Sequence, residues 1–181
     1  MGAVHESISP ELRSFIEAQH VFFVATAPLE AGGHVNLSPK GMDTFRVLSP
    51  ARVAYLDLTG SGNETAAHLT QNGRITFMFC AFEGKPMILR LYGTARPIPL
   101  DAPEVKDLAS QFPSLPGARQ LILAQISRIQ TSCGYAVPQM TFGAHRDTLI
   151  KWAESKGRDA LRQYREEKNR VSIDGLTTGQ P

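Results

Sequence analysis

A polar turn between a strand and a helix carries the clearest chemical signal in this sequence. Residues 58–69 read Leu-Thr-Gly-Ser-Gly-Asn-Glu-Thr-Ala-Ala-His-Leu. Ser61 and Glu64 have the spacing of a capping box, which would place the first backbone N–H groups of the helix around residues 62–65. Free N–H groups and the positive end of a helix dipole suit a phosphate, and the turn adds three hydroxyl side chains. The segment predicts a phosphate site, while a capped helix without a ligand explains the same pattern and stays open as an alternative.

Lys40 is the second group that could hold an anion. It follows a proline in the segment Val35-Asn-Leu-Ser-Pro-Lys-Gly41. If the hairpin that contains this segment lies beside the 58–69 turn, the ammonium group would complete the phosphate site. A solvated surface lysine is the alternative.

Other chemistries find less support in the spacing of the residues. The stretch Gly60 to Thr65 is one glycine short of a dinucleotide fingerprint, and Glu83, which would be the ribose-binding acid, falls in a tight hairpin turn instead of at the end of a parallel strand. The sequence contains no phosphate-binding loop of the GxxxxGK[ST] type. The five histidines have no zinc-binding spacing, so we expect no metal site. Cys80 and Cys133 are too few for a disulfide framework.

The composition is that of a globular protein with balanced charge. The chain has 181 residues, 42% of them hydrophobic, and a formal net charge of +2. This balance gives no indication of a nucleic-acid partner. Neither a signal peptide nor a membrane-spanning run is evident, so we expect a soluble, cytoplasmic protein without membrane contacts.

The predicted elements are mostly short strands joined by hairpins. We expect strands at residues 21–27, 34–37, 53–58, 74–82, 87–95 and 119–132, the last of which has a periodicity that also fits a helix. Helices are expected at 9–20, 65–71 and 101–112, with caps at Ser9 and Asp101, and a charged helical tail is expected at 142–170. This order favours a mainly β fold, an antiparallel barrel with helices at its ends, over alternating βαβ units.

Three segments together resemble the FMN-binding split β-barrels of the pyridoxamine 5'-phosphate oxidase-related branch. They are 35–41, 55–69 and the hairpin end Arg90-Leu-Tyr-Gly-Thr-Ala-Arg96. The resemblance spans about residues 10–135, and the tail through Gly175 is similar to a subgroup of that branch. It implies a split-barrel domain at residues 1–140 and a helical extension at 141–181 that packs on the barrel or on a dimer partner. It also implies a homodimer with FMN at the interface.

The resemblance also implies which residues bind the cofactor. Carried over by position, the candidates are Ser38, Lys40, Thr59, Gly60, Ser61, Asn63, Glu64 and Thr65, with Arg90 and Trp152 as further candidates. Arg90 faces either solvent or a polar ligand, and Trp152 either packs in a core or dimer contact or stacks on the flavin. The pyridoxamine phosphate oxidase itself has a turn of S-R-K type here, and this chain lacks that basic pair. The resemblance therefore supports FMN binding more strongly than it supports oxidation of vitamin B6.

The function expected from the resemblance is that of an FMN-dependent oxidoreductase acting on a small molecule. No catalytic residue is identified, because hydride transfer to a flavin requires no acid or base of the protein. Two alternatives remain: the same fold with a deazaflavin or haem, and a flavin-binding or ligand-sensing protein without enzymatic activity.

Overall fold

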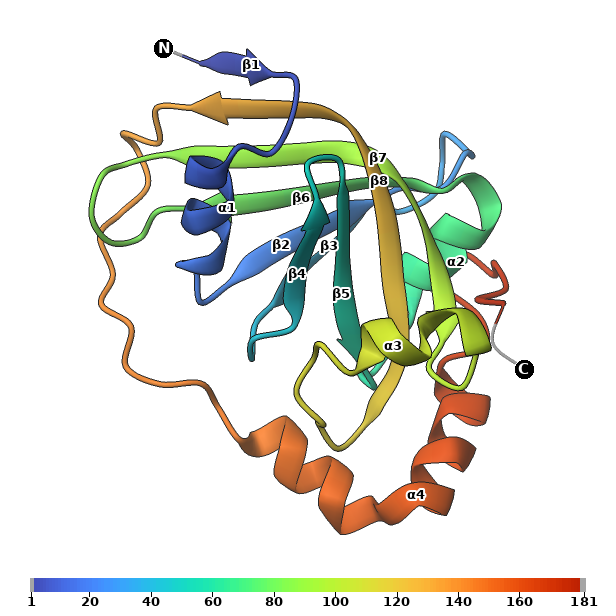
Figure 1. Cartoon of the computed structure of the whole chain (residues 1–181). Helices are drawn as coiled ribbons and strands as arrows, with labels where there is room; N and C mark the ends of the chain where they lie inside the picture. The colour runs from blue at the N-terminus through green and yellow to red at the C-terminus, as the bar shows by residue number, and fades with distance from the viewer. Residues whose placement is uncertain (1, 180–181) are drawn as a thin grey trace.

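The computed structural model describes residues 2–179 and is built around one curved antiparallel sheet (Figure 1). The strands are β1 (Ala3–His5), β2 (Phe22–Thr26), β3 (Asn36–Lys40), β4 (Phe45–Ser49), β5 (Arg52–Leu58), β6 (Arg74–Cys80), β7 (Ile88–Pro99) and β8 (Ala118–Ser132). The helices are α1 (Pro10–Glu17), α2 (Glu64–Asn72), the 3-10 turn η1 (Pro103–Val105), α3 (Lys106–Ala109) and α4 (Thr148–Lys168). The expectation of a mainly antiparallel β fold is confirmed.

The strand order explains how distant segments come together. The sheet runs β3-β2-β6-β7-β8-β5-β4, with β1 added to β8. The long strands β7 and β8 pair over most of their length, so β8 is a strand and not the helix that its periodicity also allowed. β5 pairs with β8 in a register that places Asp57 opposite Gln120. Within the described residues no ladder joins β3 to β4, so the sheet curves without closing.

The inner face of the sheet holds an aromatic core. Tyr55 and Phe77 are fully buried, and they form a connected cluster with Phe22, Phe45 and Phe79 in which neighbouring rings meet edge-on or stacked, with centroids 5.0–6.0 Å apart. Helix α1 adds Leu12 and Ile16 to this cluster. Ser9 caps α1, as predicted, by accepting a hydrogen bond from Leu12 N at 3.3 Å. Two alternate residues of β5, Ala54 and Leu56, belong to a second hydrophobic cluster that includes residues of η1 and α3.

Several sequence expectations about local structure were wrong. β1 and β4 were not predicted. The expected helix at 101–112 is two short pieces, and its N-cap position is Ala102, without a side-chain cap, instead of Asp101. The capping box is also wrong: α2 begins at Glu64 after Asn63, no side chain caps it, and Ser61 is exposed.

The helical tail bends back onto the sheet. In α4 the dihedral angle φ of Gly157 is 71°, which breaks the helix into two arms. In Figure 1 the second arm turns toward α2, so that the C-terminal segment lies beside that helix. No helix in the described part of the chain is long and apolar enough to cross a membrane.

Candidate functional site

The inward face of β3 lies beside the polar turn that precedes α2. Asn36, Ser38 and Lys40 alternate with exposed residues along β3. The Asn36 side-chain amide donates to Thr65 Oγ1 at 3.0 Å, and the Ser38 hydroxyl donates to Asn36 Oδ1 at 3.0 Å. The early hairpin therefore lies next to the turn, which was the condition for Lys40 to contribute there, while the phosphate site itself stays a prediction.

Lys40 enters a buried ionic cluster centred on Asp57. The carboxylate of Asp57 is 1% exposed and lies 3.0 Å from Lys40 Nζ and 2.7 Å from Arg119 Nε. Gln120 Nε2 donates to the same carboxylate at 2.8 Å. Burial alone would raise the pKa of Asp57, but the charges of Lys40 and Arg119 outweigh it and hold that pKa well below its usual range. Asp57 therefore stays ionised and fixes both cations.

Two arginines that are distant in sequence converge on the polar turn. Arg119 Nη1 donates to the carbonyl oxygen of Gly62 at 3.1 Å, and Arg165 Nε donates to Thr59 Oγ1 at 2.7 Å. Burial and the nearby charge of Arg119 lower the pKa of Arg165. The two positive charges repel each other, and a bound anion would reduce this repulsion. The arginine pair therefore favours an anion at the turn.

Asn169, at the C-terminal end of α4, joins the turn to this arginine pair. Its Oδ1 accepts a hydrogen bond from Arg119 at 2.8 Å, and its Nδ2 donates to Gly60 O at 3.2 Å. Its side chain is buried. The tail helix thus forms one wall of the site.

Two polar atoms near the turn are left without partners. Asn63 Nδ2 and His68 Nε2 are buried and make no hydrogen bond with the described residues. Asn63 holds its other amide atom, Oδ1, against Gln120 Nε2 at 3.1 Å. An unpaired buried donor costs about 1–3 kcal/mol, so a ligand acceptor at Asn63 would be stabilising.

The remaining predicted residues are distributed around this site or lie away from it. Glu64 accepts the backbone N–H of Ile173 at 3.2 Å and so faces the C-terminal segment. Arg90 is at the other end of the sheet, where Nη1 donates to Ser132 Oγ at 2.9 Å. Trp152 lies on α4 and packs edge-on against Tyr164. The structure therefore brings the β3 residues next to the 59–65 turn and places Arg90 away from both, whereas Trp152 faces a cavity that it lines together with Lys40.

Sequence reasoning missed Asn36, Asp57, Arg119, Arg165 and Asn169. One signal was available for Asp57: a lone acid within the apolar strand Ala54-Tyr-Leu-Asp-Leu58 is rarely buried without a cationic partner. Arg119 at the start of an apolar strand is the matching signal. No comparable signal marks Arg165, because it lies among many other charges of the tail.

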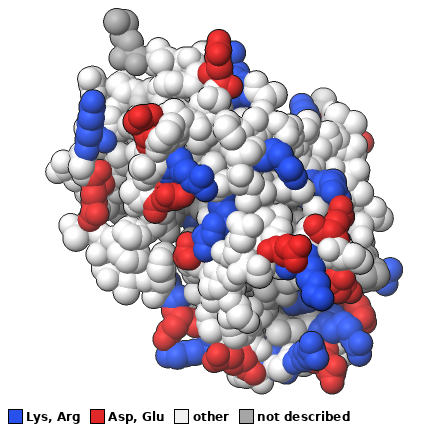
Figure 2. Space-filling model, in the orientation of Figure 1, with Lys and Arg blue, Asp and Glu red and all other residues white. Residues whose placement is uncertain are grey.

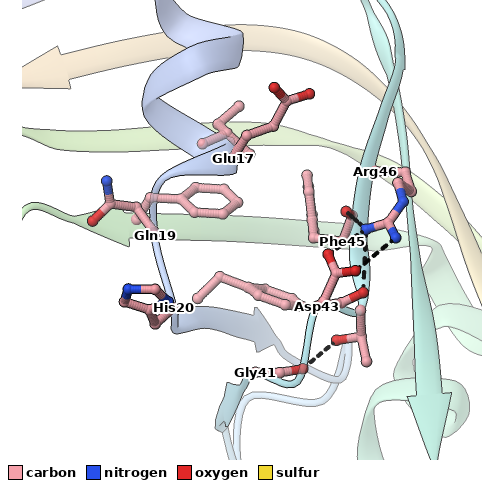
Figure 3. A pocket seen from close by; sticks show the side chains of 11 residues that line it. Glu17, Gln19, His20, Gly41, Asp43, Phe45 and Arg46 are labelled. Atoms are coloured by element: carbon pink, nitrogen blue, oxygen red, sulfur yellow. Dashed lines mark hydrogen bonds and ion pairs between the residues drawn. The ribbon is translucent and has the colours of Figure 1, made fainter. Parts of the chain in front are cut away.

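Two cavities lie next to the site. The larger, of about 1080 Å³, is lined by Lys40 and Trp152 together with the end of α1, the β6–β7 turn and residues 140–149. The smaller, of about 250 Å³, lies between α1 and the β3–β4 turn and is shown in Figure 3. Arg46 at the rim of the smaller cavity forms an ion pair with Asp43 at 2.7 Å, so its charge is already neutralised. His20 lines both cavities.

The surface outside these cavities carries mixed charge. Figure 2 shows Lys and Arg side chains interspersed with Asp and Glu across the face in view. Within residues 2–179, no group of three or more His, Cys, Asp and Glu side chains is placed to hold a metal ion. The concentration of positive charge around Asp57 is therefore a local feature of the buried site.

Comparison with known proteins agrees with this architecture. Residues 8–133 match the family model described as pyridoxamine 5'-phosphate oxidase. The pyridoxamine 5'-phosphate oxidase family protein ustO of Aspergillus flavus is 40% identical over an alignment that covers 97% of this chain and 77% of that protein.

Solved structures show the same fold at low identity. HupZ of Group A Streptococcus is 24% identical, with a TM-score of 0.54 over 67% of this chain and 91% of that one. The FAD binding protein of Mycobacterium smegmatis is 14% identical, with a TM-score of 0.50 over 71% of this chain and 97% of that one. From the family match and the 40% identity to ustO, the chain belongs to the pyridoxamine 5'-phosphate oxidase family.

Proposed function

We propose that this protein is an FMN-dependent oxidoreductase that acts on a small molecule and holds the FMN phosphate at the 59–65 turn. The observation that carries the proposal is the convergence of Arg119 and Arg165 on this turn. The turn itself contains no arginine or lysine, and the two arginines supply the missing basic pair from β8 and α4.

The charge and hydrogen-bonding capacity of the site fit a phosphate. Lys40, Arg119 and Arg165 give three positive charges against the two carboxylates of Asp57 and Glu64, an excess of one. Asn63 Nδ2 is a buried donor without a partner. An added phosphate oxygen would satisfy that donor and reduce the repulsion between the arginines.

The protein's own groups would bind and orient the cofactor. Arg165 and Thr59 would hold the phosphate end, and Ser38, which is fixed by Asn36, would present its hydroxyl along β3. When bound, FMN supplies hydride and electron transfer. The residues of this chain supply position and electrostatics, which explains why no acid–base pair is needed among them.

The proposed assembly is a homodimer with the cofactor at the interface. Leu37 on the outer side of the edge strand β3 is 62% exposed, and Val35, just before that strand, is 73% exposed. Exposed apolar residues on a sheet edge are usually covered in an assembly. Light scattering at several concentrations tests this, and Leu37→Lys is expected to shift the protein toward monomer.

Titration of the full-length protein with FMN tests the phosphate assignment. We expect Arg165→Gln to weaken FMN binding by about tenfold, since a charge-assisted hydrogen bond to phosphate is lost. The matched control is Arg162→Gln on the same helix, whose side chain is 75% exposed. Gly60→Ala is a second variant that tests the turn. The added Cβ meets no atom of the protein within 4 Å, so we expect the fold to stay intact and FMN affinity to report on the site alone.

The outcomes separate the proposal from its alternatives. Equal FMN affinity in the wild type, Arg165→Gln and Gly60→Ala would reject the phosphate site. Bound FMN whose absorption does not bleach with NADH or NADPH, without oxygen, would favour a flavin-binding or sensing role. Binding of haem or a deazaflavin in place of FMN would change the cofactor within the same fold.

A further inference from the structure

The larger cavity, of about 1080 Å³, is a second potential binding site that shares only its Lys40 wall with the ionic cluster. One side is the extended segment at residues 139–147, here called the strap, which connects β8 to α4. Backbone hydrogen bonds hold the strap in place: Met140 N donates to Phe82 O and Phe142 N to Glu83 Oε1, both at 3.0 Å. The cavity is therefore bounded by chain fixed at defined positions.

Aromatic rings form much of the cavity wall. Phe142 stacks on His20 with ring centroids 3.7 Å apart and an interplanar angle of 16°. His145 meets Phe142 edge-on at 4.9 Å. Phe82 and Trp152 line the same space. Flat aromatic surfaces of this kind favour a planar ligand, because stacking adds to the burial of apolar area.

The lining of the cavity carries little net charge, but one of its cations is free to bind a ligand. Glu83 is the acidic lining residue, and its carboxylate accepts the N–H of Phe142. Lys40 is neutralised by Asp57 at 3.0 Å. Arg146 is exposed and makes no ion pair or hydrogen bond with the described residues, so its guanidinium is available to a ligand. One free guanidinium fits a carboxylate, which it can bind through two parallel hydrogen bonds.

We propose that this cavity binds a planar aromatic molecule bearing a single negative charge, such as an aromatic carboxylate, with the ring against the Phe142 and Trp152 walls and the anionic group at Arg146. The binding proposal stands without a flavin, whereas the identification of this ligand as the substrate rests on the proposed oxidoreductase function. A site for a phosphate dianion would call for more free positive charge than Arg146 supplies.

Anilinonaphthalene sulfonate, an aromatic monoanion, tests the site together with its uncharged analogue N-phenylnaphthylamine. Trp152 is the single tryptophan of the chain and lines this cavity, so energy transfer from it to the sulfonate shows that the probe binds near it, and the Arg146 variant tests whether it binds in the cavity. We expect Arg146→Gln to weaken sulfonate binding by about tenfold and to change binding of the uncharged analogue by less than about twofold. Arg158→Gln, an exposed arginine outside the cavity lining, is the control and should match the wild type for both probes.

Four further outcomes are informative, and the first three of them contradict the proposal. Equal sulfonate affinity in the wild type and Arg146→Gln would show that the arginine does not select an anion. Absence of energy transfer from Trp152 in the purified assembly would mean that another part of the protein, such as a second copy, covers the cavity. Competition between FMN and the sulfonate would make the cavity the flavin site itself. A protein that binds the sulfonate as expected but never binds FMN would overturn the proposed function and leave this site standing.

Discussion

Arg119 Nε and Asp57 Oδ2 are 2.7 Å apart in a buried ion pair, with side chains 4% and 1% exposed. The pairing of β5 with β8 sets this contact, because Asp57 lies opposite Gln120, the neighbour of Arg119. Lys40 reaches the second carboxylate oxygen from β3. One carboxylate therefore links three strands of the sheet at the edge of the candidate site.

Asp57→Asn is expected to lower the free energy of unfolding by about 3–5 kcal/mol, because it leaves Arg119 and Lys40 near the core without their counter-charge. Urea denaturation followed by circular dichroism measures this change. Asp159→Asn is the control, since that side chain is 96% exposed and should change stability by less than about 0.5 kcal/mol. A loss below about 1 kcal/mol in Asp57→Asn would mean that the cluster is not held together by this charge.

Lys40→Met is expected to make the fold more sensitive to acid. The pKa of Asp57 is lowered in the folded protein, so its contribution to stability is present above the unfolded pKa and is lost as the pH falls through the folded pKa. For a carboxyl group with an ordinary pKa near 3.9, that window lies below about pH 4. Removing Lys40 takes away one of the charges that lower the pKa, so the acid-unfolding midpoint should move to higher pH. An unchanged midpoint would show that Arg119 alone sets the pKa.

His34 and Asp174 join the β2–β3 loop to the C-terminal segment through a contact that depends on pH. His34 Nδ1 lies 2.6 Å from Asp174 Oδ1, and His34 N donates to the other carboxylate oxygen at 2.8 Å. The side-chain hydrogen bond and the charge of Asp174 raise the pKa of His34. Because the folded pKa is the higher one, the stabilisation is full below the unfolded pKa near 6.5 and is lost as the pH rises through the folded pKa.

An NMR titration of the His34 imidazole measures this directly. We expect a pKa above the ordinary value near 6.5 in the wild type and a fall toward that value in Asp174→Asn. His34→Gln should lower the melting temperature more at pH 6 than at pH 8. A His34 pKa that is the same in the wild type and in Asp174→Asn would contradict the pairing.

The sequence was sufficient for the parts of the site that depend on local pattern. The glycine-rich turn at 59–65 and the hairpin containing Lys40 were both recognisable, but their proximity was only a condition of the predicted site until the structure showed it. Arg119 and Arg165 were not predictable in this way, because they lie 57 and 106 residues from the turn atoms they contact. Their positions depend on the β5–β8 register and on the bend of α4 at Gly157, neither of which hydrophobic periodicity reveals.

Gly93 lies where β7 approaches the backbone of β8 closely, at an irregularity in their pairing between Tyr92 and Gly93. A Cβ added to Gly93 would overlap the carbonyl oxygen of Gln125 and come within 3.0 Å of Ile126 Cα. The neighbouring atoms belong to backbone inside the longest ladder of the sheet, so they cannot move aside as a flexible side chain would.

Gly93→Ala should therefore lower the free energy of unfolding by about 1–3 kcal/mol, the usual penalty for forcing an extra group into packed structure. Gly32→Ala is the matched control, because no atom lies within 4 Å of the Cβ that it would add. Chemical denaturation of both variants gives the comparison, and equal stability would mean that β7 and β8 separate at the irregularity without loss. Since β8 also carries Arg119, a shift of β8 away from β7 would displace the arginine from the turn, and Gly93→Ala should weaken FMN binding along with stability.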